Sequence, residues 1–262
     1  MPDAKLTVYI QDASEKLAIE TRPLILICPG GGYAYTSDRE AEPIALTFLA
    51  MGYHAAVLRY SCAPAKYPTA LLELASSILL IRKNAKEWHV NPKKIVVQGC
   101  SAGGHLAACL GMFWDEDFLA DKLGVSAKKH ELLKPNGMIL CYPVITSGEF
   151  AHKGSFQNLL GEEPDEELMD KLSLEKQVTE KTPKAFIWGT LTDASVPMEN
   201  SLLLVSAMRR ANVSVEYHLY PRGAHGLALA NKLTQASDGR CVQEECANWP
   251  GLAHTWLEKL FR

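Results

Sequence analysis

Long hydrophobic runs and an excess of one charge are both missing from this chain of 262 residues. Lys and Arg together number 27 and Asp and Glu 30, which gives a formal net charge of −3. This balance disfavours nucleic acids and anionic membrane surfaces as partners, because binding to either depends on gathered positive charge. The longest apolar runs, such as residues 24–28, are far shorter than the roughly 20 residues of a membrane-spanning helix.

Paired cysteine motifs are also missing. The seven cysteines are odd in number and include no Cys-x-x-Cys pair, which disfavours a disulfide framework and a structural zinc site. The first residues contain no basic stretch followed by an apolar one, so we expect no secretory signal peptide. These features predict a cytoplasmic, reducing location, with most thiols buried as small hydrophobic side chains. No cluster of His, Asp or Cys has convincing ligand spacing, and we predict neither a metal nor a cofactor.

Short β-branched apolar segments alternate with longer segments of helical periodicity. The sequence predicts buried strands at 24–28, 54–60, 94–98, 138–142, 184–188 and 213–220, with a weaker edge strand at 6–10. It predicts helices at 42–51, 71–88, 102–114, 198–211 and 250–261, the last opened by a proline. Continuous apolar strands that alternate with helices are typical of an α/β fold, in which helices cover both faces of a mostly parallel sheet.

No internal repeat or flexible linker divides the chain, and we expect a single domain over residues 1–262. The polar stretch at about 146–183 interrupts the alternation and is too long for a simple connection. It is predicted to be helical over 165–178 and to form an insertion that caps the sheet. A homodimer through the edge strand or the surface helices stays an open alternative.

The strongest chemical signal is the segment Gly-Cys-Ser-Ala-Gly-Gly at residues 99–104, between a predicted strand and a predicted helix. It fits the Gly-x-Ser-x-Gly nucleophile elbow, in which a tight turn exposes the serine hydroxyl at the end of the sheet. The helix N-terminus behind Ser101 favours developing negative charge. An ordinary glycine-rich turn is the alternative. Cys100 is expected to pack under the turn, although a redox-sensitive thiol is also considered.

A serine hydroxyl needs a base, and the base needs a carboxylate to orient it. His225 follows the last predicted strand in a Gly-Ala-His-Gly loop, whereas His218 and His254 lie within a strand and a helix. Asp193 follows the strand at 184–188, and Glu199 is the alternative carboxylate. We therefore predict Ser101, Asp193 and His225 as a catalytic triad in the chain order of this hydrolase type.

A glycine-rich segment follows the first buried strand. Its sequence is Pro-Gly-Gly-Gly-Tyr at residues 29–33. Bare N–H groups of glycine approach a substrate oxygen closely, so we predict Gly31, Gly32 and the N–H of Ala102 as the oxyanion hole. A phosphate-binding loop is disfavoured, because the Lys-Ser/Thr ending of a P-loop is missing.

Four motifs in this order, at 29–33, 99–108, 192–197 and 225–227, resemble the α/β-hydrolases. The chain looks most like their small esterase branch, which includes acetyl xylan esterase-like and hormone-sensitive-lipase-like enzymes. Pro29 stands where the lipase-like enzymes have a His before the glycines, and this form fits the acetyl-esterase-like enzymes better.

The resemblance implies an α/β-hydrolase fold and a serine carboxylesterase for short-chain acyl esters, with sugar O-acetyl groups as one substrate class. Tyr33, Tyr35 and Tyr60 are candidates to line the site of the alcohol, with packing as the alternative role. An amidase or aryl-formamidase with the same triad stays open. A non-catalytic small-molecule binder is disfavoured, because all three triad residues are present.

Overall fold

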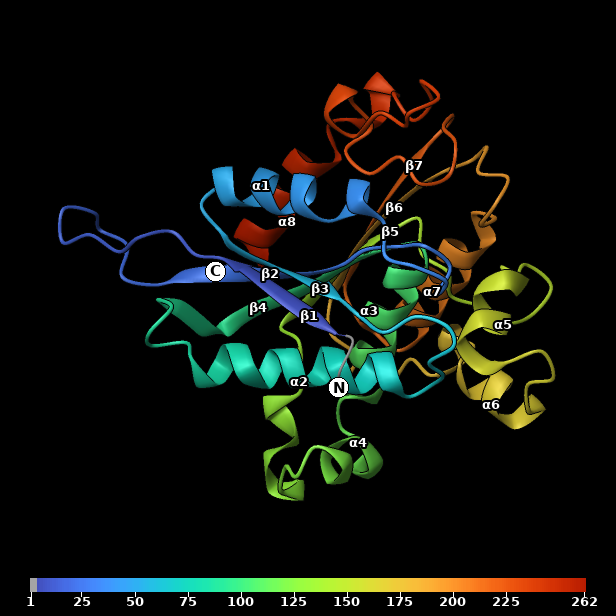
Figure 1. The fold of residues 1–262 in the computed structure, drawn as a ribbon, viewed down its shortest axis with the longest axis horizontal. Helices are drawn as coiled ribbons and strands as arrows, with labels where there is room; N and C mark the ends of the chain where they lie inside the picture. The colour runs from blue at the N-terminus through green and yellow to red at the C-terminus, as the bar shows by residue number, and fades with distance from the viewer. Residues whose placement is uncertain (1–3) are drawn as a thin grey trace.

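The computed structural model describes residues 4–262, so the first three residues of the predicted domain lie outside it (Figure 1). Within this range seven strands form one sheet, in the order β1-β3-β2-β4-β5-β6-β7. β1 pairs antiparallel with β3 at one edge, and every other pairing is parallel. The strands are β1 (Lys5–Tyr9), β2 (Arg22–Cys28), β3 (His54–Arg59), β4 (Val90–Cys100), β5 (Gly137–Cys141), β6 (Ala185–Thr190) and β7 (Val215–Tyr220).

Helices cover both faces of the sheet (Figure 1). They are α1 (Glu42–Ala50), α2 (Thr69–Lys83), α3 (Ala102–Phe113), α4 (Asp117–Lys122), α5 (Lys153–Leu160), α6 (Glu166–Lys171), α7 (Glu199–Arg210) and α8 (Trp249–Leu260). One hydrophobic core lies between the sheet and α2, α3 and α7, and a second lies between the sheet and α1 and α8.

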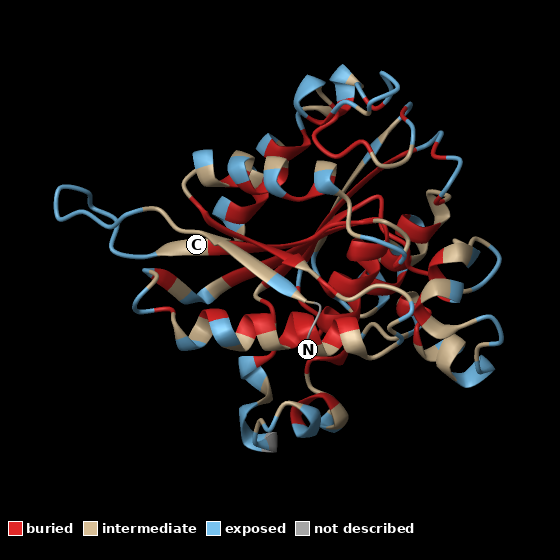
Figure 2. Ribbon diagram, viewed as in Figure 1, coloured by how far each residue is buried: buried red, intermediate tan, exposed pale blue. Residues whose placement is uncertain are grey.

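The two cores explain why the central strands contain unbroken apolar runs. In β2, Leu24 and Leu26 belong to the first core, whereas Ile25 and Ile27 belong to the second. Successive side chains of a strand point to opposite faces, so a strand buried on both sides needs apolar residues throughout. Figure 2 shows the result, a buried sheet inside a partly exposed layer of helices.

Each predicted strand and helix outside residues 146–183 is present, with two notable differences in extent. α2 ends at Lys83, and residues 84–89 form turns even though Ala85 and Trp88 continue the apolar spacing. β4 begins at Val90, which pairs with Arg22 of β2. Residues 91–93, which precede the predicted strand at 94–98, therefore lie inside β4.

The predicted helix at 165–178 is wrong in its extent. The stretch 146–183 contains α5, which was not predicted, then α6 and a short 3₁₀ helix at Leu174–Lys176. Side-chain caps define both α-helices, since His152 accepts a hydrogen bond from the N–H of Ser155 and Asp165 accepts one from Glu167. The short α4 was also not predicted. In Figure 1, α5 and α6 lie beside one end of the sheet.

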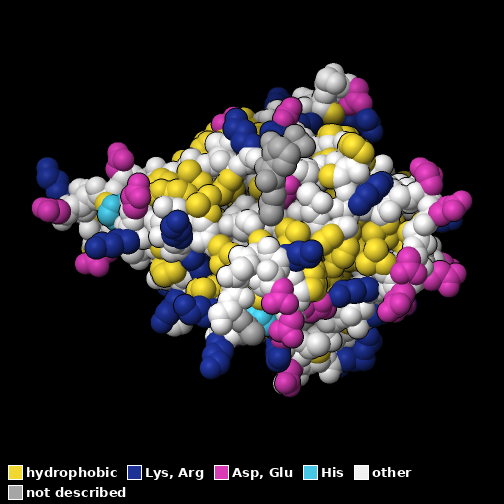
Figure 3. Space-filling view, turned by 60° about the horizontal axis from the view of Figure 1, so that its bottom comes forward, with side chains coloured by type: hydrophobic (Ala, Val, Ile, Leu, Met, Phe, Trp, Pro, Cys, Tyr) yellow, Lys and Arg dark blue, Asp and Glu magenta, His cyan; other side chains and the backbone are white. Residues whose placement is uncertain are grey.

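Within residues 4–262 no helix is both long enough and apolar enough to cross a membrane. The face shown in Figure 3 carries acidic and basic side chains, with hydrophobic ones between them.

Candidate active site

Ser101 occupies a strained turn between β4 and α3. Its φ of 53° and ψ of −120° lie in a region that non-glycine residues rarely adopt. The chain can turn here because Gly99 and Gly103, two positions away on each side, lack side chains. A Cβ on Gly99 would lie 2.1 Å from the carbonyl oxygen of Gly103, and a Cβ on Gly103 would lie 2.0 Å from that of Cys28. The two glycines of the motif are therefore required by close backbone contacts on both sides of Ser101.

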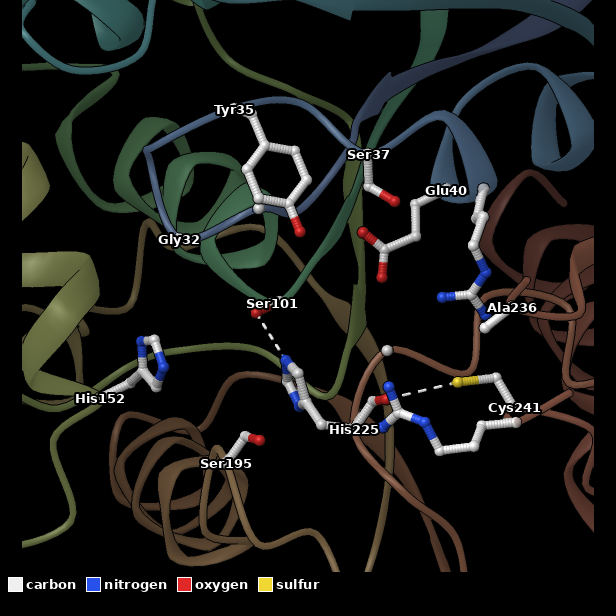
Figure 4. Close-up of a pocket in the computed structure, with 14 residues that line it drawn as sticks. Gly32, Tyr35, Ser37, Glu40, Ser101, His152, Ser195, His225, Ala236 and Cys241 are labelled. Atoms are coloured by element: carbon white, nitrogen blue, oxygen red, sulfur yellow. Dashed lines mark hydrogen bonds between the residues drawn. The ribbon is translucent and has the colours of Figure 1, made fainter. Parts of the chain in front are cut away.

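His225 lies between Ser101 and Asp193. Its Nε2 is 2.7 Å from Ser101 Oγ (Figure 4). Its Nδ1 is 2.6 Å from Asp193 Oδ2. The other carboxylate oxygen of Asp193 accepts hydrogen bonds from the N–H groups of Ser195 and Val196, at 2.9 and 3.0 Å. Because Asp193 can only accept, Nδ1 carries the imidazole proton and Nε2 is left as an acceptor for the serine hydroxyl. The fold thus brings the three predicted triad residues into one hydrogen-bonded chain.

The loops after β6 and β7 explain how these two residues meet. Asp193 follows the end of β6 by three residues, and His225 follows the end of β7 by five. β6 and β7 are parallel neighbours, so their carboxyl ends lie at the same edge of the sheet. Glu199, the alternative carboxylate, begins α7, and the hydrogen bond to His225 comes from Asp193.

The glycine loop at residues 29–35 lies directly against Ser101. A Cβ on Gly30 would be 3.0 Å from Ser101 Cβ. Gly31 and Gly32 have φ values of +130° and +64° and line the cleft at Ser101. Within residues 4–262, the N–H groups of these two glycines donate to no protein acceptor. Ala102 is the first residue of α3, and its N–H has no partner inside the helix.

The three predicted tyrosines lie in two different environments. Tyr35 is 64% exposed and lines the cleft. Tyr33 and Tyr60 are buried under the glycine loop, where their hydroxyls bond to His105 Nδ1 at 2.9 Å and to the carbonyl oxygen of Pro29 at 2.6 Å. Tyr33 and Tyr60 are therefore not among the residues that line the cleft, and their burial fits the packing role that was the alternative.

The cleft at Ser101 has a volume of about 370 Å³. Figure 4 shows Tyr35, Ser37 and Glu40 on one side of Ser101 and His225, with His152 and Ser195 on the other. Sequence reasoning missed the lining residues Ser37, Arg39, Glu40, His152, Ser195, Gly226, Ala236, Arg240 and Cys241. Most of them lie in loops without a chemical motif, which left no local signal to find them.

His152 is the most distinctive of these missed residues. Its Nδ1 lies 2.8 Å from Ser155 Oγ and also accepts from the N–H of Ser155. Burial lowers the pKa of His152, and nearby His225 lowers it further, although Asp193 opposes the shift. The ring is therefore mostly neutral at pH 7. Its position at the start of α5 brings the stretch 146–183 to the wall of the cleft.

Several known proteins are similar to this chain in sequence. The model of the BD-FAE family matches residues 7–208. The chain is 37% identical over 216 residues to endo-1,4-beta-xylanase B of Butyrivibrio fibrisolvens, with 80% of this chain and 33% of that protein covered. It is 31% identical over 207 residues to the acetylxylan esterase of Xylanibacter ruminicola, with 77% and 40% covered. The chain thus spans between a third and two-fifths of the length of these two curated relatives.

The fold is also similar to a solved structure over nearly its whole length. The acetyl ester-xyloside bifunctional hydrolase of Caldicellulosiruptor lactoaceticus superimposes with a TM-score of 0.83 at 38% identity. That match covers 97% of this chain and 87% of the other. The family match, the seven-stranded sheet and the order of the motifs lead to one assignment. The chain belongs to the BD-FAE family and has the α/β-hydrolase fold.

Proposed function

We propose that the protein is a serine carboxylesterase for short-chain acyl esters, with Ser101, Asp193 and His225 as its catalytic residues. The observation that carries this proposal is the hydrogen-bonded chain from Ser101 Oγ through His225 to Asp193, at the floor of an open cleft. The similarity of the chain to an acetylxylan esterase and to an acetyl ester-xyloside bifunctional hydrolase supports the same chemistry.

In the first half of the reaction, Ser101 Oγ attacks the acyl carbon while His225 Nε2 takes the hydroxyl proton. Asp193 holds the imidazole by Nδ1 and stabilises its positive charge. The C–O bond of the ester then breaks, and the alcohol leaves with the proton from His225. In the second half, His225 takes a proton from water, the resulting hydroxide attacks the acyl-enzyme, and the acid is released as Ser101 regains its proton.

The oxygen of the acyl group becomes negative in both halves. Gly31, Gly32 and Ala102 are proposed as the N–H donors that stabilise it, because the first two face the cleft without a protein acceptor and the third begins α3. Removal of one such donor typically lowers the rate by about 10²- to 10³-fold.

The lining of the cleft supports a polar alcohol. Tyr35, Ser37, Arg39 and Arg240 all reach its wall. Hydroxyl and guanidinium groups of this kind can hydrogen-bond to free hydroxyls of a sugar. Small-molecule esters, with O-acetyl groups on sugars among them, are therefore the proposed substrates.

The stretch 146–183 is proposed as a short cap on a single domain. It supplies His152 to the cleft, and the amide of Asn158 in α5 donates to the carbonyl oxygen of Gly32 at 2.9 Å. The cap thus contacts the glycine loop and narrows the cleft from one side. The cytoplasmic location and the homodimer expected from the sequence stay predictions.

The proposal is tested by hydrolysis of nitrophenyl acetate, butyrate and octanoate. We expect acetate to react fastest and Ser101→Ala to lose about 10⁴- to 10⁶-fold in kcat. Ser77→Ala is the matched control, because Ser77 is 6% exposed, close to the 7% of Ser101, yet lies in α2 away from the cleft. Cleavage of activated anilides without cleavage of the three esters would instead identify an amidase. Failure of a serine-directed phosphonate to label Ser101 would contradict both activities.

A further inference from the structure

Glu40 is a buried carboxylate in the wall of the cleft. It is 4% exposed, lines the cleft beside Ser101 and His225, and takes part in none of the ion pairs within residues 4–262. A buried charge is costly unless hydrogen bonds stabilise it. The partners of its two oxygens therefore show what this carboxylate does.

The first oxygen contacts the glycine loop. Glu40 Oε2 accepts a hydrogen bond from the N–H of Gly30 at 2.8 Å. Gly30 directly precedes the two proposed oxyanion donors, and a Cβ placed on it would lie 3.0 Å from Ser101 Cβ. This bond therefore fixes the loop at the point where it passes the nucleophile.

The second oxygen contacts Tyr142, the residue after β5. Glu40 Oε1 accepts from the Tyr142 hydroxyl at 2.8 Å, and the same hydroxyl accepts from the N–H of Ala228 at 2.9 Å. Ala228 lies three residues beyond His225. The ring of Tyr142 meets the His225 imidazole edge-on, with centroids 5.1 Å apart.

The phenol of Tyr142 is a dependable donor to the carboxylate. Burial raises the pKa of Tyr142, and the nearby Cys100 and Glu40 raise it further. The hydroxyl thus stays protonated at neutral and mildly alkaline pH, so that each oxygen of Glu40 keeps its donor there.

We propose that Glu40 is a positioning residue for the reaction. It holds the glycine loop through Gly30, and it holds the loop that carries His225 through Tyr142 and Ala228. The inference rests on the proposed esterase function. One carboxylate thereby couples the two loops that must face each other across Ser101. Displacement of either loop by about 1 Å is enough to lower the rate up to about 10²-fold.

The test compares Glu40→Gln and Tyr142→Phe with the wild type on nitrophenyl acetate. We expect kcat to fall about 10- to 100-fold in Glu40→Gln and KM to change less than about threefold. Misplaced loops reduce the stabilisation of the transition state more than they reduce the binding of the substrate. The double variant is expected to lose little more than the worse single variant, since both changes break the same chain of contacts.

Glu73→Gln is the matched control. Glu73 is 2% exposed and its two oxygens accept from the N–H and hydroxyl of Ser61, but it does not line the cleft. The substitution Glu73→Gln is expected to lower the melting temperature without lowering kcat. Equal kcat losses in Glu40→Gln and Glu73→Gln, or wild-type kcat in both Glu40→Gln and Tyr142→Phe, would overturn the inference.

Amide hydrogen exchange separates this inference from the esterase proposal. In Glu40→Gln and Tyr142→Phe we expect faster exchange in residues 29–35 and 225–229, and unchanged exchange there in Glu73→Gln. A wild-type protein inactive on every ester would refute the proposed function. The exchange rates would then still decide whether Glu40 holds the two loops, and unchanged rates would refute that role.

Discussion

The hydroxyl of Tyr33 donates to Nδ1 of His105 across 2.9 Å, which ties the glycine loop to the first turn of α3. The other ring nitrogen, Nε2, lies 3.0 Å from the carbonyl oxygen of Leu172 and donates to it. One nitrogen accepts and the other donates, which is the pattern of a neutral imidazole. Burial lowers the pKa of His105 to about 4.

The first prediction concerns acid stability. His105 has a pKa near 6.5 in the unfolded chain and about 4 in the folded one, so between these values only the unfolded chain binds the proton. Stability should therefore fall as the pH drops from 6.5 to 4, by at most about 3 kcal/mol from this residue. Urea unfolding at pH 7.5, 5.5 and 4.5 measures it. In His105→Gln, the free energy of unfolding should fall less between pH 7.5 and 4.5 than in the wild type, with a difference of at most about 3 kcal/mol. Equal losses in both proteins would contradict the lowered pKa of His105.

The second prediction concerns Asp193→Asn. The amide oxygen can still accept from Ser195 and Val196, but the amide N–H₂ then faces His225 Nδ1 and favours the wrong imidazole tautomer. We expect kcat on nitrophenyl acetate to fall about 10⁴-fold with little change in the melting temperature. A loss below tenfold would show that Asp193 does not orient the base.

The third prediction contrasts the two glycines proposed as oxyanion donors. A Cβ on Gly31 would lie 2.2 Å from the carbonyl oxygen of Tyr35, whereas the nearest atom to a Cβ on Gly32 is Ser155 Oγ at 3.8 Å. Gly31→Ala should displace the loop and remove most activity. Gly32→Ala should fold with a loss of about 1 kcal/mol from its left-handed φ alone. Melting curves and kcat for the two variants check this, and equal effects on both would contradict the geometry.

The fourth prediction concerns the thiol of Cys100, which directly precedes Ser101. Cys100 is fully buried, its Sγ accepts from Gln98 Nε2 at 3.2 Å, and burial raises its pKa well above the usual value. We expect iodoacetamide at pH 7.5 to leave Cys100 unmodified in the native protein and to label it after unfolding. Peptide mapping by mass spectrometry measures both states, with Cys241 in the cleft wall as the internal comparison. Rapid native labelling of Cys100 would favour the redox-sensitive alternative.

The parts of the fold that were predictable from the sequence have local signals. Leu24 and Ile25 belong to different cores, and this alternation along β2 requires an unbroken apolar run. Such a run can be recognised from a short stretch of sequence. Ser101 lies in a short motif between a predicted strand and a predicted helix. Asp193 and His225 could be found because each also follows a predicted strand.

The parts that were missed depend on contacts between distant residues. Glu40 and Tyr142 are 102 residues apart, and nothing near either one indicates the other. Tyr33 and Tyr35 are close in sequence, yet the φ of 59° at Tyr33 turns one ring inward and leaves the other exposed. Backbone conformation of this kind follows from the packing of the whole loop, not from residue type.

The placement of the proposed triad after three different strands also has a consequence for refolding. Ser101 follows β4 near the centre of the sheet, whereas the His225 loop follows β7, which pairs only with β6 at the far edge. Ser101 and His225 therefore meet only after β5, β6 and β7 have all docked beside β4. Parallel strands joined by long connections dock late in folding. Hydrolytic activity regained after dilution from denaturant should consequently trail the return of the helical circular dichroism signal, and its rate would report completion of the sheet.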